Sequence, residues 1–465
     1  MASEATVTQE APIDELAAIV GQGNIFSSRR ARLAYEYDAT PKTVEPGVVL
    51  FPRNASEVSA VMRVAEREGI PVVARGAGTN LSGGTVPLKA GIVLVCTRMN
   101  AVLEVDPRNE RAVVEPGVVN LDLQRMLSPE GCLFAPDPSS QKVSTLGGNV
   151  GENAGGPHCL KYGITTDHVL GLEVVLADGE VVRTGGMVED CPGYDLTGLM
   201  VGSEGTLGVV TKMMVRLMRQ PEAVLTMLAI FDRLEDSGDA VSDIIAEGII
   251  PATLEIMDRT IVEAVEASAN RAGYPVEAEA VLLVELDGLK DGLERQAHRI
   301  VEICQRRRVR QVQVAETEAD RDRLWTGRRA AYSALVSLAA GASIHDTTVP
   351  RTRLAETLHQ VREIARRHRL TIGTAAHAGD GNLHPLIVFD PDDPEEVERV
   401  HRADREIVEL CVAMGGTLTG EHGIGIEKRD YMPLLFGPQE LELMRRIKRV
   451  HDPKGILNPG KLLPE

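Results

Sequence analysis

Short apolar runs alternate with amphipathic stretches in the first half of the chain. In "VVLFPRNASEVSAVMRVAEREGIPVVARGAG", residues 48–78, an apolar run precedes a helix-like segment, and a second apolar run leads into glycines. This order predicts strand, helix, strand and loop, and "NASE" supplies the N-cap chemistry with which a helix begins. Further strands are predicted at 91–96, 111–117, 171–179 and 180–186. The block ends near Met218, and residues 12–45 ahead of it are predicted to be a helical lead-in.

A second pattern begins at about residue 222. The apolar runs "AVLTMLAIFD", "PATLEIMD" and "AVLLVELDG" predict strands, and stretches such as "ERQAHRIVEICQRRR" predict helices between them. This recurrence favours an α/β cap built on an antiparallel sheet, and the whole chain is predicted to be α+β.

Composition narrows the class of protein. The chain has 465 residues, 43% of them hydrophobic, which is enough for two or three domains. A net charge of −18 argues against a nucleic-acid groove, because phosphate binding needs an excess of Lys and Arg. No long apolar run predicts a membrane span, and the acidic N-terminus has no signal-peptide core. A cytoplasmic protein is expected, and peripheral membrane attachment through a partner stays open.

The six cysteines are widely spaced. They stand at positions 96, 132, 159, 191, 304 and 411, and no two of them form a CxxC pair. We therefore predict reduced thiols, without an iron–sulfur or zinc-ribbon framework.

Two of the 11 histidines flank a glycine-rich turn in "HAGDGNLHP", residues 377–385. Asp380-Gly381 is a favoured central pair for a type I′ hairpin turn, which would place His377 opposite His384. Opposed residues share one face of a sheet, and two imidazoles so placed can bind one metal ion. Two solvated loop histidines are the alternative.

Three glycine-rich stretches stand in the first half, at Pro71–Gly84, Ser144–Gly163 and Val201–Lys212. The first follows a predicted strand, but Leu81 stands where a Rossmann fingerprint needs its third glycine, and no Walker A lysine follows. Glycines at such density favour close approach of the backbone to a ligand. Together the three stretches predict a large phosphate-bearing cofactor.

The order "RGAGTNLSGG", "FAPDPSS", "GGNVGENAGG", "GSEGTLGVVTK", "HAGDGNLHP", "GEHGIG" and "NPGK" resembles the FAD-linked oxidases of the vanillyl-alcohol oxidase/PCMH type. The likeness is greatest to the glycolate oxidase catalytic subunit and D-lactate dehydrogenase group, and it covers roughly residues 45–463. It implies a two-subdomain PCMH-type FAD-binding fold with an α/β cap domain. The expected parts are a lead-in at 1–45, an FAD-binding domain at 46–220, a cap carrying substrate and metal residues at 221–425, and a C-terminal segment at 426–465 that returns to the FAD domain.

The resemblance also implies which residues bind FAD. The pyrophosphate, the flavin ring, and the ribityl and adenine parts are expected on Arg75, Gly76, Ala77, Gly78, Thr79, Asn80, Pro136, Asp137, Ser140, Gly148, Asn149, Gly151, Asn153, Ala154, Gly155, Gly202, Glu204, Gly205, Gly208, Val210 and Asn458. His158 does not clearly match a motif that tethers flavin, so non-covalent FAD is expected.

The same resemblance implies a metal-assisted oxidation. His377, His384 and Glu421 are the expected ligands of a divalent metal, zinc first, with manganese and iron left open. His422 is expected to take the substrate hydroxyl proton as general base, while the α-hydrogen leaves as hydride to flavin N5. Arg328 is expected to hold the substrate carboxylate, and Arg329 is its rival on the same helix.

"GASIHDTTVP" departs from the 2-hydroxyglutarate relatives, which carry a lysine where Ile344 stands here. A small monocarboxylate, glycolate or D-lactate, is therefore expected, and a D-2-hydroxyglutarate-type dehydrogenase is the alternative. The resemblance implies a separate electron acceptor, such as an iron–sulfur subunit, and a homodimer is a further expectation. A metal-dependent hydrolase and a non-catalytic flavoprotein are the competing classes.

Overall fold

The computed structural model describes residues 11–186, 188 and 192–464, so Cys191 and the first ten residues of the predicted lead-in lie outside the described residues. The chain forms two compact units. Unit 1 comprises 1–155, 164–220 and 421–465, and unit 2 comprises 156–163 and 221–420. The chain thus passes from unit 2 back to unit 1 between Gly420 and Glu421.

Unit 1 begins with a small four-stranded sheet of order β1-β2-β4-β3. Asn54 caps α3 as predicted, since its side chain accepts the Glu57 N–H at 3.0 Å. Helices α1 and α3 bury their apolar faces with strands β2, β3 and β4 in one core. The elements here are α1 (Ile13–Val20), β1 (Ile25–Phe26), α2 (Arg29–Arg32), β2 (Val48–Leu50), α3 (Ala55–Glu68), β3 (Val72–Arg75) and β4 (Ile92–Val95). The lead-in is therefore helical only in part.

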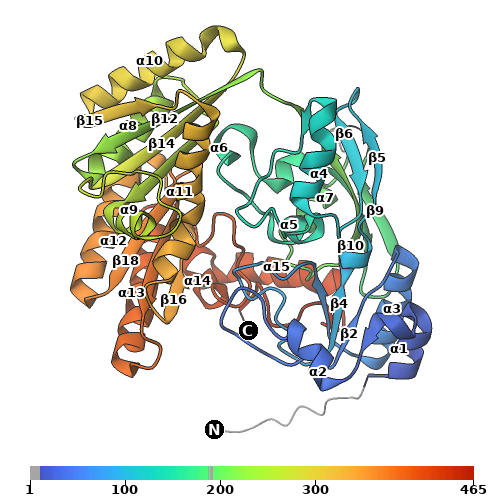
Figure 1. Ribbon diagram of the computed structural model, residues 1–465. Coiled ribbons are helices and arrows are strands. Elements are labelled where there is room, and N and C mark those ends of the chain that lie inside the picture. The colour runs from blue at the N-terminus through green and yellow to red at the C-terminus, as the bar shows by residue number, and fades with distance from the viewer. Residues whose placement is uncertain (1–10, 187, 189–191, 465) are drawn as a thin grey trace. The chain divides into compact units, whose positions relative to one another are not determined.

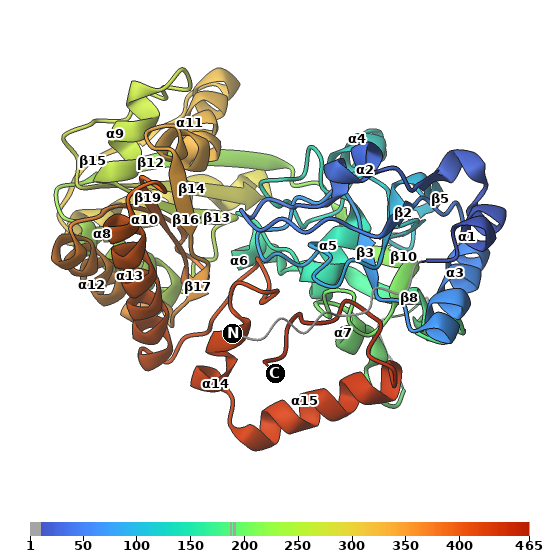
Figure 2. The same cartoon turned by 90° about the horizontal axis from the view of Figure 1, so that it is seen from below.

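A five-stranded antiparallel sheet, β5-β6-β10-β8-β9, forms the other half of unit 1. Burial alternates strictly along β10, so Met213 and Val215 face a core while their neighbours are half-buried. The elements are β5 (Val102–Asp106), β6 (Arg111–Val114), α4 (Asn120–Leu127), β7 (Cys132–Leu133), α5 (Leu146–Glu152), β8 (Val169–Val175), β9 (Val181–Gly185), α7 (Leu196–Met200), β10 (Val209–Arg216), β11 (Met218–Arg219), α14 (Met432–Leu435) and α15 (Pro438–His451). Figure 2 shows α15 as the long red helix near the C-terminus.

Unit 2 is built on an eight-stranded antiparallel sheet of order β15-β12-β14-β13-β18-β19-β16, with β17 paired to β19 (Figure 1). The antiparallel cap sheet predicted from the sequence is confirmed. The strands are β12 (Ala223–Phe231), β13 (Thr253–Asp258), β14 (Ala280–Gly288), β15 (Val309–Val314), β16 (Gly341–Ile344), β17 (Thr347–Thr348), β18 (Thr371–His377) and β19 (Asn382–Phe389).

Helices cover both faces of this sheet, which explains its nearly continuous apolar strands. Along β14, Leu282 and Val284 belong to the core shared with α8, α10, α12 and α13, whereas Val281 and Leu283 belong to the core shared with α9 and α11. The helices are α6 (Cys159–Tyr162), α8 (Leu234–Ala246), α9 (Arg259–Ala267), α10 (Lys290–Arg306), α11 (Glu318–Val336), α12 (Leu354–His368) and α13 (Pro394–Ala413). Charged residues in such a buried sheet need a specific partner, and these pairs of residues define the site described below.

Candidate functional site

The first glycine loop of unit 1 folds around an arginine. Arg75 ends β3 with its guanidinium buried, and Nη1 donates to Tyr37 O at 2.6 Å and to Thr85 Oγ1 at 3.2 Å. Burial lowers the pKa of Arg75. Gly78 has φ +73°, and a Cβ there would lie 2.1 Å from Arg75 Nη2. A side chain at Gly78 would therefore displace the guanidinium that the loop encloses.

The second glycine loop lies against the first. A Cβ at Gly76 would come within 2.1 Å of Thr145 Oγ1, just ahead of α5. Ser144 Oγ, Thr145 Oγ1 and Asn149 Nδ2 are buried and have no hydrogen-bond partner within the described part of the chain. Buried polar atoms of this kind call for an acceptor or donor from outside the chain. Beside a backbone cradle without side chains, they fit a polar, phosphate-bearing cofactor.

The third loop hydrogen-bonds the end of α5. The Gly202 N–H donates to Val150 O at 2.8 Å, and the Glu204 N–H donates to Gly151 O at 2.9 Å. Glu204 has φ +52° and Asn153, which follows α5, has φ +56°. Asn153 is the left-handed C-cap of α5, where Asn is common, whereas a glutamate in this conformation is unusual and points to a functional constraint at Glu204.

Glu204 is buried and holds the chain just after His422. Its two carboxylate oxygens accept the N–H groups of Ile424 at 2.7 Å and Gly425 at 2.8 Å. Burial raises the pKa of Glu204 to about 7, although these two hydrogen bonds act in the opposite direction. Burial also raises the pKa of Glu152, well above its ordinary value, and the charge of Glu204 adds to that rise. Sequence reasoning missed Glu152, whose only signal was a carboxylate inside a glycine-rich stretch.

The C-terminal tail contacts these loops within unit 1. Asn458, at φ +39°, donates from Nδ2 to Gly84 O at 2.9 Å and to Glu204 O at 2.6 Å. Lys461 donates to Val86 O at 2.6 Å, and burial lowers its pKa to about 8. The tail therefore carries a buried cation whose charge interacts with the carboxylates of Asp38, Glu204 and Glu152.

The remaining predicted FAD residues also belong to unit 1. Pro136 O accepts Asn120 Nδ2 at 2.9 Å, and Ser140 O accepts the Ser144 N–H at 2.8 Å, so this stretch leads directly into α5. Val210 pairs with Val174 across β10 and β8. All the predicted cofactor residues thus share one unit, although their individual contacts with FAD stay predictions.

In unit 2 the hairpin of β18 and β19 corrects the predicted turn. His377 is paired with Asn382, and His384 with Ala375, so the connection has four residues, 378–381, and the predicted pairing of His377 with His384 is wrong. Gly381 has φ +74°, but Asp380 is not left-handed, and a type I′ turn would need both. The register differs from the prediction by two residues, which keeps side chains on the same face. The two rings still meet, with centroids 5.1 Å apart and an interplanar angle of 84°.

Each histidine turns its Nδ1 towards an acceptor. His377 Nδ1 lies 2.8 and 2.9 Å from the two carboxylate oxygens of Glu255, and His384 Nδ1 lies 3.3 Å from His345 O. Both acceptors lack hydrogens, so Nδ1 carries the proton in each neutral ring, and Nε2 is then the nitrogen suited to a metal. Outer partners of this kind are typical of metal-binding histidines.

Arg328 is the buried member of the arginine pair. Its Nε donates to Glu255 Oε2 at 2.7 Å, and it is 9% exposed, whereas Arg329 is exposed and lies over the Trp325 ring at 5.5 Å. Arg328 Nη2 lies 2.7 Å from the same oxygen. Glu255 thus takes one side of the guanidinium, through Nε and Nη2, and leaves the Nη1 side for an anion.

Asp346 is a residue that sequence reasoning did not select. It is completely buried and lies 4.0 Å from His384 Nδ1. Its Oδ2 accepts the Gly420 N–H at 3.0 Å and the Thr419 hydroxyl. The only signal for Asp346 in the sequence is its position inside "IHDTT", directly after Ile344 and His345. Asp346 holds the last residues of unit 2 before the chain reaches Glu421.

Glu421 and His422 belong to unit 1, and His422 Nε2 lies 4.0 Å from Glu421 Oε1. The structure therefore groups His377, His384 and Arg328 inside unit 2, while the other two predicted site residues follow that unit by one and two peptide bonds. The complete ligand set of His377, His384 and Glu421 remains a prediction.

His158 has partners of its own in unit 2. Its ring stacks on Trp325 at 6.0 Å, and Nε2 lies 3.5 Å from Glu285. Glu285 also accepts Trp325 Nε1 at 2.8 Å and Thr226 Oγ1 at 2.7 Å. Burial would raise the pKa of Glu285, but the His158 hydrogen bond, the Arg321 charge and these two further hydrogen bonds lower it to about 2.

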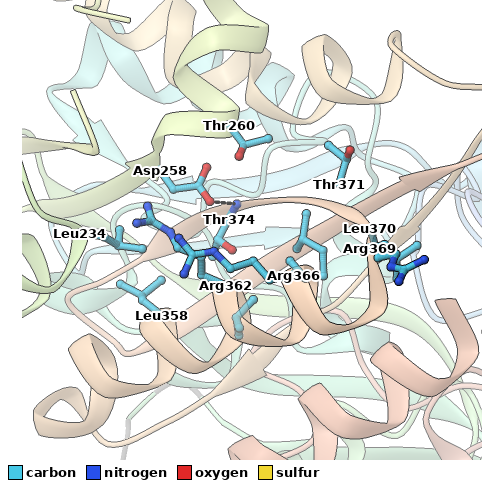
Figure 3. Close-up of a pocket in the computed structure, with 13 residues that line it drawn as sticks. Leu234, Asp258, Thr260, Leu358, Arg362, Arg366, Arg369, Leu370, Thr371 and Thr374 are labelled. Carbon is cyan, nitrogen blue, oxygen red and sulfur yellow. Dashed lines mark hydrogen bonds between the residues drawn. The ribbon is translucent and has the colours of Figure 1, made fainter. Parts of the chain in front are cut away.

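A separate pocket of about 330 Å³ lies beside α12 (Figure 3). Two of its arginines are ion-paired, because Arg362 pairs with Glu279 at 2.9 Å and Arg366 pairs with Glu363. Asp258 lies in the same pocket and accepts the Thr374 N–H, drawn as a dashed line. None of the predicted site residues lines this pocket.

Comparison with known proteins agrees with this geometry. Residues 46–185 match the FAD binding domain family, and residues 220–462 match the family of FAD linked oxidases, C-terminal domain. The chain therefore belongs to the FAD-linked oxidases and is an FAD-linked oxidoreductase. None of the helices in the described ranges combines the length and apolar character needed to cross a membrane.

Among its relatives, the chain is 44% identical to the glycolate oxidase subunit GlcD of Bacillus subtilis, covering 97% of this chain and 96% of the relative. It is 37% identical to a D-lactate dehydrogenase of Archaeoglobus fulgidus, with coverage of 97% and 99%. The fold matches p-cresol methylhydroxylase at 19% identity, with a TM-score of 0.80 and coverage of 97% and 95%. It also matches 4-ethylphenol oxidase from Gulosibacter chungangensis at 21% identity, with a TM-score of 0.77 and 97% coverage of each chain. The predicted α+β, PCMH-type fold is confirmed.

Proposed function

We propose that this chain oxidises a small 2-hydroxy acid, glycolate or D-lactate first, to the corresponding 2-oxo acid. The observation that carries the proposal is the group in unit 2 formed by two histidines, whose Nδ1 atoms face acceptors, and the buried Arg328, whose Nε and Nη2 face Glu255. A 2-hydroxy acid offers a hydroxyl and a carboxylate to such groups. The names of two relatives, a glycolate oxidase subunit and a D-lactate dehydrogenase, support the same class of substrate.

FAD, when bound, supplies the acceptor for the hydride that leaves the substrate carbon. The residues that would bind FAD are those of the three glycine loops and Asn458. The loops contain buried polar atoms without a hydrogen-bond partner in the described residues and glycines with no room for a side chain, and both features fit FAD. We propose non-covalent binding, because His158 is stacked on Trp325 and faces Glu285.

A divalent metal, zinc first, would be held by His377, His384 and Glu421, and it would lower the pKa of the substrate hydroxyl. Gly420 supports this ligand set, because Asp346 holds its N–H close to His384 and one peptide bond joins it to Glu421. Arg328 binds the substrate carboxylate through the side of its guanidinium that Glu255 leaves open. His422, next to the ligand glutamate, takes the hydroxyl proton as general base.

We further propose that electrons leave through a separate partner, for which an iron–sulfur subunit is the first candidate. The word "subunit" in the name of the Bacillus subtilis relative and the absence of any CxxC pair from the sequence support a partner. A cytoplasmic location, with membrane attachment only through that partner, fits the same proposal.

The test is anaerobic. The purified chain is mixed separately with glycolate, D-lactate, L-lactate and D-2-hydroxyglutarate while its visible flavin absorbance is followed. Bleaching by glycolate or D-lactate is expected, and it should disappear after removal of divalent metal by a chelator. A yellow protein that none of these acids bleaches refutes the substrate class. A colourless protein that cannot be reconstituted with FAD refutes the cofactor assignment and favours the hydrolase alternative.

A further inference from the structure

Glu255 is a charged residue in the middle of the buried sheet of unit 2. It is 0% exposed, and every residue of its strand β13 is buried. The register places it directly opposite His377 of β18, on the same face of the sheet. Arg328 reaches the same carboxylate from α11. A buried carboxylate with two such partners either stabilises the fold or takes part in the functional site.

We propose that Glu255 is a positioning residue that orients the metal-binding His377 and the substrate-binding Arg328 at once. This inference rests on the proposed function. A carboxylate only accepts, so the two short contacts to Nδ1 require the proton on that nitrogen and leave the Nε2 lone pair for the metal. The ring is held by both carboxylate oxygens, which fixes its plane as well as its tautomer.

Arg328 is held along one side of its guanidinium. Nε donates to Oε2 at 2.7 Å, and Nη2 lies 2.7 Å from the same oxygen. Glu255 therefore fixes the direction of the guanidinium and leaves its Nη1 side for a second carboxylate, that of the substrate. Since Oε2 also contacts His377, a change at this oxygen moves the metal ligand and the anion-binding group together.

A purely structural role predicts a different result from the same variant. If Glu255 only compensates the buried charge of Arg328, its replacement lowers stability without a specific effect on metal or substrate. Glu285 provides the matched control, because it is a buried glutamate on the adjacent strand β14, hydrogen-bonded to Trp325 and Thr226. No hydrogen bond or ion pair joins it to His377 or Arg328 in the described part of the chain.

The experiment compares Glu255→Gln with Glu285→Gln in the FAD-loaded full chain. Zinc and manganese affinities are measured by competition with a chromophoric chelator, and substrate KM is measured by flavin bleaching. Glu255→Gln is expected to weaken metal binding by about 10- to 100-fold and to raise KM, whereas Glu285→Gln changes neither by more than about twofold. Equal metal affinity and KM in Glu255→Gln and the wild type overturn the proposal. Failure of the wild type to bind metal or to be bleached is a failure of the proposed function instead.

A second measurement covers the case in which Glu255→Gln does not fold. Nitrogen-15 NMR of histidine-labelled, metal-free wild type reports the tautomer of His377, assigned by its loss in His377→Gln. The Nδ1–H tautomer is expected. The Nε2–H tautomer overturns the inference, because Nε2 would then have no lone pair for the metal.

Discussion

Gly381 lies where the β18–β19 connection has no room for a side chain. Its φ is +74°, and a Cβ there would lie 2.0 Å from Val349 O, although real Cβ contacts essentially never fall below 3.0 Å. The Val349 N–H also donates to Gly381 O at 2.9 Å, so the two backbones are locked together. Gly381→Ala must therefore push the loop between His377 and His384 away from Val349.

The cost can be built from three contributions. Left-handed backbone in a residue with a Cβ costs about 1–2 kcal/mol. Overpacking costs about 1–3 kcal/mol, and loss of the Val349 hydrogen bond costs about 0.5–1.5 kcal/mol. Gly381→Ala should thus lower the free energy of unfolding by roughly 2.5–6.5 kcal/mol. Gly248→Ala is the control, because Gly248 has φ +79° with nothing within 4 Å of its Cβ, so only the first contribution applies.

Urea unfolding followed by tryptophan fluorescence measures both variants. Trp325 is the single tryptophan of the sequence and lies in unit 2 with both glycines, so its signal reports on the right unit. Gly381→Ala is expected to cost at least about 1.5 kcal/mol more than Gly248→Ala. It should also weaken metal binding, because the displaced loop joins the two histidine strands. Equal destabilisation of the two variants would show that the Val349 backbone moves aside at no cost in free energy. The argument that this loop has no room for a side chain at position 381 would then be wrong.

Two further predictions concern carboxylates. Glu285→Gln should flatten the pH dependence of stability. Folding lowers the pKa of Glu285 from 4.5 to about 2, so the ionised carboxylate stabilises the folded chain by about 3 kcal/mol above pH 4.5. This stabilisation is lost as the pH falls towards 2. The stability gap between wild type and variant, measured by urea unfolding from about pH 6 downwards, should therefore close with falling pH; a constant gap contradicts this. Gly425→Ala should slow the bleaching of the flavin by substrate about 10²-fold. A Cβ at position 425 would lie 2.0 Å from Ser82 O, so the backbone would have to move and the Gly425 N–H would leave Glu204. That movement would shift His422. An unchanged rate at normal FAD content would rule out that coupling.

Local chemistry was well predicted from the sequence. The Asn54 cap and the helix it begins follow from neighbouring residues, and so do the strands on either side of that helix. The face shared by His377 and His384 was also predicted, although their register was not. The predicted two-residue turn at Asp380-Gly381 left out Ala378 and Gly379, which also belong to the connection. Position 381 requires glycine because Val349, a residue distant in sequence, approaches it closely.

Long-range pairs could not be predicted from one sequence. Glu255 stands 122 positions from His377 and 73 positions from Arg328. Its only local signal was a charge inside the apolar strand "PATLEIMD", which predicts a buried partner without naming it. Asp346 is a similar case, since its contact with Gly420 spans 74 positions.

The segment that carries Glu421 and His422 shows why these long-range carboxylates matter. Before it, Asp346 of unit 2 holds the Thr419 hydroxyl and the Gly420 N–H. After it, Glu204 of unit 1 holds two consecutive backbone N–H groups, those of Ile424 and Gly425. The proposed third metal ligand and the proposed base thus occupy the stretch where the chain passes between units, and a buried carboxylate fixes the backbone on each side. Each carboxylate thus fixes the backbone of its own unit beside Glu421 or His422, although neither residue lies in a helix or strand.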